Sequence, residues 1–483
     1  SIMAVLVLSA LLFSSGTYAQ VVENPGLAQK QVQEYLKNKQ WDEAIKTLTE
    51  LIEWEQPAPE FYYNRGYAYQ NKGMDSLAYL DFSKALELKP NFIDAMTGNA
   101  LISLKNNAYS VAISEFSKVI ALDPSNTDNY TFRGIAYFKK GDYEHALTDY
   151  SKALKLDPRS AEALNNRAAL YVAKNDFDNA LRDFTSVIEI DPSKPSAFSG
   201  RANIYRQRQS YDLAISDYGK AIALNPNDTD SYYRRAKMYI AQMNWGRAIS
   251  DLTDAIRLKP TETDYYNERG NAYYSNNDHN AAIMDFSRAI QLDPRSVYAL
   301  IGRGLAYAKK GAYDLAIADY EQARSIDSTN SVVVHNLANT YYMQGNYDRA
   351  LTALSNILKT DSTNKELYYN RGSSYYRLNN YDKALADFNK AINLDSTYAS
   401  AYYNRGLCYA KLNSFEDAVD NFNQAIKRNP THASAYYNKG VLLEKRGLTK
   451  LAVECYEKFL AFATPQQDQL IEQARKRIRE LSH

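Results

Sequence analysis

Four asparagines near the end of the chain stand 34 residues apart, at Asn336, Asn370, Asn404 and Asn438. A primary amide both donates and accepts hydrogen bonds, so a row of amides on one face can pair with a peptide backbone of any sequence. Tyrosines accompany the series, and an exposed tyrosine adds apolar area and a hydroxyl at little entropic cost. This spacing predicts a surface that recognises proteins or peptides.

Residue patterns that carry enzymatic chemistry are missing from the sequence. The five histidines, His145, His279, His335, His432 and His483, stand at unrelated places and have no metal-ligand spacing. We find no phosphate-binding loop and no nucleophile elbow. We therefore expect no enzymatic activity, no cofactor, no metal and no small-molecule substrate.

The charge balance and the two cysteines argue against a nucleic-acid-binding protein and against a disulfide-rich one. Lys and Arg number 57 against 56 Asp and Glu, a net charge of +1, whereas a nucleic-acid partner requires a basic field. We therefore expect no nucleic-acid partner. The two cysteines, Cys408 and Cys455, cannot form a disulfide framework. A single bridge between them is the alternative to two free thiols.

A 34-residue period runs through the chain without insertion or deletion. Its marker is a proline, from Pro90 to Pro294, replaced by serine at Ser328, Ser362 and Ser396 and restored at Pro430. The marker is counted as position 32 of each repeat. The thirteen repeats then start at residues 25, 59, 93, 127, 161, 195, 229, 263, 297, 331, 365, 399 and 433.

Each repeat carries the signals of two helices and a tight turn. Position 20 is alanine in all thirteen repeats, and position 8 is glycine or alanine in all but one, where Val32 stands. These small residues let helix A and helix B approach closely. Position 15 is glycine or asparagine in ten repeats, as expected for a left-handed helix end. The proline at position 32 ends helix B because it cannot continue the hydrogen-bond ladder.

This pattern resembles the tetratricopeptide repeat family, from Pro25 to Gln466. The resemblance implies an all-α fold, a right-handed α-α superhelical solenoid of 34-residue helix-turn-helix repeats. It also implies a concave groove that binds extended peptides or partner segments. The fourth repeat shows the pattern with Tyr130, Gly134, Tyr137, Ala146, Tyr150, Ala153 and Pro158.

The two ends of the chain depart from the period. The apolar run Ile2–Phe13 with small residues before Ala19 predicts a signal peptide over 1–19, followed by a linker over 20–24. The run is shorter than the roughly 20 apolar residues that a membrane span needs, so we expect only transient membrane contact. An uncleaved anchor is the alternative. Residues 467–483 are expected to form an amphipathic helix that caps the last repeat.

Positions 7 and 23 change together along the array. Aspartate at position 23 always accompanies arginine at position 7, and repeat 10 loses both, with Leu337 and Ala353. This pattern predicts structural, partly buried ion pairs between helices A and B, with two independent surface preferences as the alternative. The eight predicted pairs are Arg65–Asp81, Arg133–Asp149, Arg167–Asp183, Arg201–Asp217, Arg235–Asp251, Arg269–Asp285, Arg303–Asp319 and Arg371–Asp387.

Helical phase at about 100° per residue separates two arcs of helix A. Positions 4, 7, 8 and 11 form the packing arc, and positions 2, 5, 6, 9, 12 and 13 form an open arc. Most of the 42 tyrosines belong to the core. The predicted binding residues on the open arc of repeats 10–13 are Asn336, Asn370, Asn404, Asn438, Tyr342, Tyr369, Tyr376, Tyr403, Tyr437, His335 and Asn339.

The asparagine series resembles the asparagine ladder in the superhelix of O-linked N-acetylglucosamine transferases, but here it is confined to the last four repeats. Its alternative is a consensus residue that only caps neighbouring loops. We predict an exported bacterial, non-catalytic scaffold that binds partner proteins or peptides in the periplasm or at the cell surface. The alternatives are a self-assembling homo-oligomer or filament, and an accessory subunit of an envelope complex.

Overall fold

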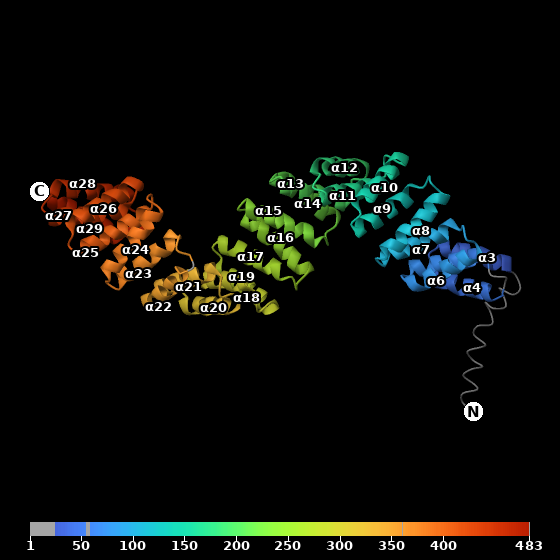
Figure 1. Cartoon of the computed structure of the whole chain (residues 1–483), viewed down its shortest axis with the longest axis horizontal. Helices are drawn as coiled ribbons and strands as arrows, with labels where there is room; N and C mark the ends of the chain where they lie inside the picture. The colour runs from blue at the N-terminus through green and yellow to red at the C-terminus, as the bar shows by residue number, and fades with distance from the viewer. Residues whose placement is uncertain (1–24, 55–57, 360, 483) are drawn as a thin grey trace, which may run out of the picture. The chain divides into compact units, whose positions relative to one another are not determined.

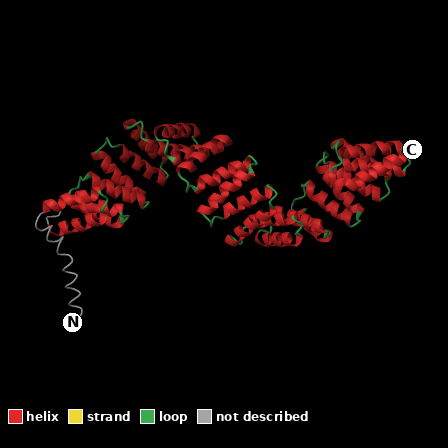
Figure 2. Ribbon diagram, turned by 180° about the vertical axis from the view of Figure 1, so that it is seen from behind, coloured by secondary structure: helices red, strands yellow, loops and turns green. Residues whose placement is uncertain are grey.

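The computed structural model describes residues 25–54, 58–359 and 361–482. Within these residues the regular elements are all helices, and no strand occurs (Figure 2). This confirms the predicted all-α superhelical repeat fold. None of the helices in this part of the chain combines the length and the apolar character needed to cross a membrane. The predicted signal peptide (1–19) and linker (20–24) lie outside the described residues.

The described residues divide into two compact units, those up to Met238 and those from Tyr239 onward. In the first unit each helix from α3 to α14 packs against the next one (Figure 1). Its helices are α3 (Pro25–Lys37), α4 (Trp41–Trp54), α5 (Pro59–Asn71), α6 (Asp75–Leu88), α7 (Ile93–Lys105), α8 (Tyr109–Leu122), α9 (Thr127–Lys140), α10 (Tyr143–Leu156), α11 (Ala161–Ala173), α12 (Phe177–Ile190), α13 (Pro195–Gln207) and α14 (Tyr211–Leu224).

The helix α15 (Thr229–Ala241) contains the boundary between the units. In the second unit each helix again packs against the next, from α16 to α29. These helices are α16 (Trp245–Leu258), α17 (Thr263–Ser275), α18 (His279–Leu292), α19 (Val297–Lys309), α20 (Tyr313–Ile326), α21 (Ser331–Gln344), α22 (Tyr347–Ile357), α23 (Lys365–Arg377), α24 (Tyr381–Leu394), α25 (Ala399–Lys411), α26 (Phe415–Arg428), α27 (Ala433–Lys445), α28 (Thr449–Phe462) and α29 (Asp468–Leu481), with a short 3₁₀ turn at Pro465–Gln467.

The first helix of every pair begins at the residue that the period places at position 1, for example Pro59 and Val297. The turn between the two helices is also uniform, because residue 15 has a positive φ in every repeat. Three of these residues are neither glycine nor asparagine: Lys39 at 57°, Gln209 at 58° and Met243 at 56°. The antiparallel docking of helices A and B therefore imposes the left-handed conformation even where the residue does not favour it.

An aromatic ring at position 24 of helix B fills the space between successive A helices. Phe286 is fully buried, and its ring lies against Gly270 of its own repeat and Gly302 of the next. A Cβ added to Gly270 would come within 3.0 Å of this ring, and one added to Gly302 within 2.5 Å. The absence of side chains at these two positions is therefore what admits the ring.

The helix α29 covers the end of the last repeat. Ala474 is fully buried, and Leu470 and Ile478 pack with the fully buried Phe459 of α28. An ion pair between Arg477 and Glu444 fastens α29 to α27. These contacts shield the apolar face that a further repeat would otherwise cover.

Candidate interaction surface of the last four repeats

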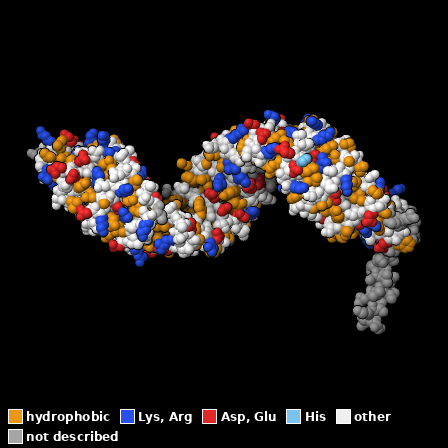
Figure 3. Space-filling model, viewed as in Figure 1, with side chains coloured by type: hydrophobic (Ala, Val, Ile, Leu, Met, Phe, Trp, Pro, Cys, Tyr) orange, Lys and Arg blue, Asp and Glu red, His pale blue; other side chains and the backbone are white. Residues whose placement is uncertain are grey.

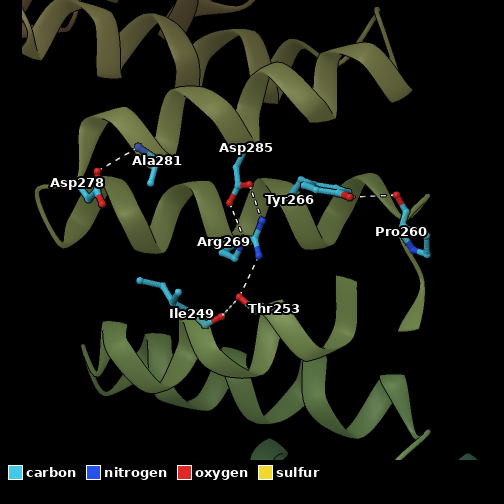
Figure 4. Close-up of polar contacts among 8 residues, drawn as sticks. All are labelled: Ile249, Thr253, Pro260, Tyr266, Arg269, Asp278, Ala281 and Asp285. Carbon is cyan, nitrogen blue, oxygen red and sulfur yellow. Dashed lines mark hydrogen bonds and ion pairs between the residues drawn. The ribbon is translucent and has the colours of Figure 1, made fainter. Parts of the chain in front are cut away.

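Bidentate ion pairs hold the two helices of most repeats in register. In seven of the eight predicted pairs both residues lie within one unit, and in each of them the Nε and Nη2 atoms of arginine donate to the two carboxylate oxygens of aspartate at 2.7–3.0 Å. Figure 4 shows this arrangement for Arg269 and Asp285. The eighth pair, Arg235 and Asp251, has one residue in each unit.

The arginine also reaches the preceding repeat. Arg269 donates through Nη1 to the hydroxyl of Thr253 at 2.9 Å, and this hydroxyl donates to the carbonyl of Ile249 at 2.7 Å (Figure 4). Five other arginines make the same bond to a serine or threonine at position 25 of the preceding repeat. The sequence prediction missed this partner, although serine or threonine recurs at position 25. Each of these six guanidinium groups therefore joins two repeats.

The four asparagines of the predicted surface lie half-buried on α21, α23, α25 and α27. Asn404 donates through Nδ2 to the hydroxyl of Ser373 on the preceding A helix at 3.2 Å. Asn438 donates to the hydroxyl of Tyr403, at a different position of the preceding A helix, at 2.9 Å. These amides connect successive A helices, so their spacing is fixed by the packing of the repeats. Beside them, His335 is half-buried and Asn339 is exposed.

The tyrosines at position 5 are less open than helical phase predicts. The rings of Tyr369, Tyr403 and Tyr437 are half-buried and pack on aromatic rings of helix B of their own repeats. The centroid separation is 6.0 Å between Tyr369 and Phe388 and 5.8 Å between Tyr403 and Phe422. Position 5 lies on the open arc of helix A taken alone, but the adjacent B helix closes one side of that arc. These tyrosines are therefore part of the packing and present only one side to a ligand.

The remaining two tyrosines stand at position 12, near the turn. Tyr342 packs on Tyr347 with ring centroids 5.3 Å apart, and Tyr376 packs on Tyr381 at 5.6 Å. Arg377 donates to the hydroxyl of Tyr342 at 3.2 Å, which links α23 to α21. Burial raises the pKa of Tyr376. The surface of repeats 10–13 is therefore a row of half-buried amides and phenols that neighbouring helices hold in place.

A histidine supports this surface from the loop before α27. His432 packs on Tyr403 with ring centroids 4.7 Å apart and the ring planes tilted by 39°, and its Nδ1 accepts the N–H of Ala435 at 3.2 Å. Burial lowers the pKa of His432 below its ordinary value and raises the pKa of Tyr403 to about 12. Both side chains are therefore neutral at pH 7, and only the histidine titrates on mild acidification.

We expect the start of α27 to loosen as the pH falls from 7.5 to 5. The lowered pKa of His432 means that the unfolded chain takes up its proton first, near pH 6.5, so stability is complete above that pH and declines below it. A protonated Nδ1 also cannot cap Ala435. Faster hydrogen exchange in the first turn of α27, corresponding to about 1 kcal/mol, would show this effect.

The matched control for this pH effect is His432→Asn. Asparagine caps a helix at the same repeat position at Asn330 and Asn364 and does not titrate. After correction for the intrinsic pH dependence of amide exchange, the exchange rates of this variant should not change with pH. An equal acid response in both proteins would show that another group is responsible.

Comparison with known proteins assigns the repeats to a family. Profiles described as TPR repeat or tetratricopeptide repeat match residues 59–92, 134–174, 161–194, 202–242, 270–311, 307–370, 372–413, 399–432 and 421–454. The chain therefore belongs to the tetratricopeptide repeat family, whose repeat fold generally serves protein–protein interaction and is typically non-catalytic. None of the curated proteins matches it.

Several solved structures are similar to the chain. The C-terminal part of a TPR repeat-containing protein from Cytophaga hutchinsonii is 19% identical, with a TM-score of 0.44, covering 49% of this chain and 98% of that one. A MamA fragment from Desulfovibrio magneticus is 29% identical, with a TM-score of 0.34, covering 35% and 95%. Yeast Tom70 is 18% identical, with a TM-score of 0.38, covering 93% and 95%.

Proposed function

We propose that this protein is a non-catalytic scaffold that binds an extended segment of a partner protein along the A helices of repeats 10–13. The observation that carries the proposal is the series of half-buried amides, Asn336 to Asn438, one on each successive A helix. Bonds such as Asn438 to Tyr403 fix the spacing of the series. A row of amides held at regular intervals suits the regular donors and acceptors of a peptide backbone.

The aromatic side chains beside the amides supply the apolar part of this surface. Tyr369, Tyr403 and Tyr437 are held by their own B helices, so little side-chain freedom is lost when a ligand contacts them. The hydroxyl of Tyr403 accepts a hydrogen bond from the amide of Asn438, whereas the hydroxyl of Tyr437 donates to Gln473 of α29. A ligand would therefore place its backbone on the amides and an apolar side chain against the rings.

The leader predicted at residues 1–19 supports the proposal that this activity lies outside the cytoplasm. On this proposal the protein gathers its partners in the periplasm or at the cell surface. Assembly through the free end of the solenoid is the alternative function, but α29 already covers the apolar end of the last repeat. Light scattering of the purified protein separates the two functions, since the scaffold alone is expected to be monomeric.

The test compares proteins crosslinked to the wild type and to two variants in the native cell. The first variant carries Asn370→Ala, Asn404→Ala and Asn438→Ala. The control carries Asn356→Ala, Asn393→Ala and Asn423→Ala, which removes three exposed amides from B helices of repeats 10–12. We expect the specific partner to fall at least tenfold with the first variant and to stay unchanged with the control.

One further measurement, thermal unfolding, is needed to interpret this comparison. Asn404 and Asn438 also bond to the preceding repeat, so thermal unfolding must first show that the first variant remains folded at the assay temperature. If the folded variant retains the full set of partners, the site assignment is wrong. If the control loses the same partners, binding takes place on the outer face.

A further inference from the structure

A pocket of about 470 Å³ opens between α6 and α8, the B helices of the second and third repeats, beside the last turn of α7. Its wall is largely apolar and includes Leu80 of α6, Ile102 of α7 and Val111 of α8. Leu80 is 64% exposed and Val111 is 46% exposed, whereas Ile102 is buried. The pocket is therefore an apolar recess whose mouth opens to solvent between two B helices.

The third repeat departs from the period at position 11, which lines this pocket. Tyrosine stands at position 11 in eleven repeats, whereas the third repeat has Ser103. Tyr79 of the preceding B helix brings a ring to one wall from position 21, where the other twelve repeats have an aliphatic residue. This ring does not close the space, because Tyr79 and Ser103 both still line the pocket.

The third repeat also lacks the ion pair of positions 7 and 23. Asn99 stands in place of the arginine, and Glu115 stands in place of the aspartate. Glu115 accepts hydrogen bonds from the hydroxyls of Ser103 at 2.8 Å and Tyr79 at 3.4 Å, and burial raises its pKa. Within the described residues no cation lies at ion-pairing distance from Glu115, whereas seven repeats give the carboxylate at this position a guanidinium. Two hydroxyls of the pocket lining therefore hold a carboxylate that has no counter-ion in contact with it.

A second carboxylate lines the pocket directly. Asp75, at the start of α6, pairs through Oδ2 with Lys105 at 2.6 Å. Its Oδ1 is inaccessible to solvent and accepts no hydrogen bond from the residues that the structure describes. In the same part of the chain, the side-chain carbonyl of the buried Asn99 also lacks a donor. Buried acceptors without donors are costly, so this region favours a ligand that brings a donor.

The surface beside the pocket carries little charge. Figure 3 shows basic and acidic side chains spread over the visible face of the protein. Positions 18 and 19 of the B helix are polar or charged in the fourth and fifth repeats. In the second and third repeats they are Ser76, Leu77, Ser110 and Val111. An uncharged surface thus leads to a pocket whose free polar groups are acceptors.

We propose that this pocket binds the lysine or arginine side chain of a partner protein. The aliphatic stem would lie on Leu80, Ile102 and Val111, and the cationic head would donate to Oδ1 of Asp75. The head would also lie beside the hydroxyls that hold Glu115, and would supply there the positive charge that arginine supplies in the paired repeats. An aliphatic side chain would leave these acceptors unpaired, and an acidic one would be repelled.

Disulfide tethering on the full-length protein tests the proposal. Ser76→Cys places a thiol on the exposed rim of the pocket. Cys408 and Cys455 are buried and burial raises the pKa of both thiols, so neither competes. The probes are acetylated tetrapeptide amides, Cys-Gly-X-Gly, with X as lysine, arginine, norleucine or glutamate. Each is equilibrated with the variant and 2-mercaptoethanol, and the mixed disulfide is measured by mass spectrometry.

We expect the lysine and arginine peptides to form the mixed disulfide about tenfold more favourably than the norleucine peptide, since a hydrogen bond to a charged group is worth at least that factor. Norleucine has the stem of lysine without its charge. Ser110→Cys is the matched control, because it makes the same substitution at position 18 one repeat further on, where Tyr137 occupies position 11. Its ratio should be near one.

Two further variants test the parts of the site. Adding Ser103→Tyr to the Ser76→Cys protein restores the ring that most repeats carry, and should bring the ratio near one by closing the pocket. Adding Asp75→Asn with Lys105→Gln removes the acceptor carboxylate at constant net charge, and should have the same effect. The second variant decides the question if Ser103→Tyr fails to fold.

Three outcomes would overturn the proposal. These are a ratio near one in the Ser76→Cys protein, an equally high ratio in the Ser110→Cys protein, and a ratio that the added substitutions leave unchanged. The pocket lies on B helices of the first unit and does not depend on the A-helix surface of repeats 10–13. Failure of the asparagine variant there would not change these ratios, so the two proposals can fail separately.

Discussion

Replacing Arg303 with leucine should lower the free energy of local unfolding of the ninth repeat by about 3–5 kcal/mol. Asp319 is 4% exposed, and both of its carboxylate oxygens accept a hydrogen bond from Arg303. Hydrogen bonding to Asp319 raises the pKa of Arg303, so the guanidinium stays charged. Without the guanidinium a carboxylate stays buried with no cation, and Ser287 of the preceding repeat loses its donor as well.

Hydrogen exchange over α19 and α20 measures this loss directly. A local measurement is needed because each repeat contacts only its neighbours and unfolding of a solenoid is not all-or-none. The expected result is faster exchange in these two helices and in α18, which carries Ser287. Unchanged protection would mean that the ion pair contributes no more than a surface pair does.

The double variant Arg303→Leu with Asp319→Ala is the matched control. It copies the tenth repeat, which has Leu337 and Ala353 at the two positions, both buried. Removing both charges leaves no uncompensated carboxylate, so we expect it to recover most of the stability lost in Arg303→Leu. A double variant as unstable as the single one would indicate that lost packing, not the unpaired charge, causes the effect.

Replacing Phe286 with alanine should destabilise the contact between the eighth and ninth repeats by about 3–5 kcal/mol. The ring is fully buried and lies between Gly270 and Gly302, neither of which has a side chain that could fill the cavity. The lost packing therefore destabilises both neighbouring A helices, α17 and α19. We expect a lower urea midpoint and faster exchange of α17–α19.

Phe286→Leu provides the comparison. Leucine stands at position 24 in three repeats, at Leu48, Leu252 and Leu354, so this position tolerates it. We expect a loss of no more than about 1.5 kcal/mol, in line with other changes of shape between large apolar residues. If the alanine and leucine variants were equally stable, the ring would not be what holds the A helices together.

Much of the fold follows from the sequence because the repeats act as an internal alignment. The period places the starts of the A helices at residues such as Pro59 and Val297, where the structure has them. The joint change of positions 7 and 23 predicted partners that lie within 3.0 Å of each other in the seven pairs contained in one unit. A correlation across copies reports on contacts within a repeat, because both residues belong to the same copy.

Contacts between neighbouring repeats were harder to predict. The sequence shows that serine and threonine are preferred at position 25. Only the structure shows that Thr253 accepts a hydrogen bond from Arg269, the arginine of the next repeat. The half-burial of Tyr369 could not be predicted either. Helical phase describes a single helix, whereas the ring that covers Tyr369 comes from the B helix, elsewhere in the sequence.

The asparagine series of the C-terminal repeats was determined by the sequence alone, since residue type and spacing suffice to find it. The tertiary structure decided that two of these amides, Asn404 and Asn438, also join successive A helices and that the tyrosines beside the series are half-buried. The same distinction between what the sequence and the tertiary structure determine applies to the other repeats. A linear repeat specifies which residues recur and which change together, whereas exposure depends on atoms that a neighbouring helix contributes, and only the packed chain brings those atoms together.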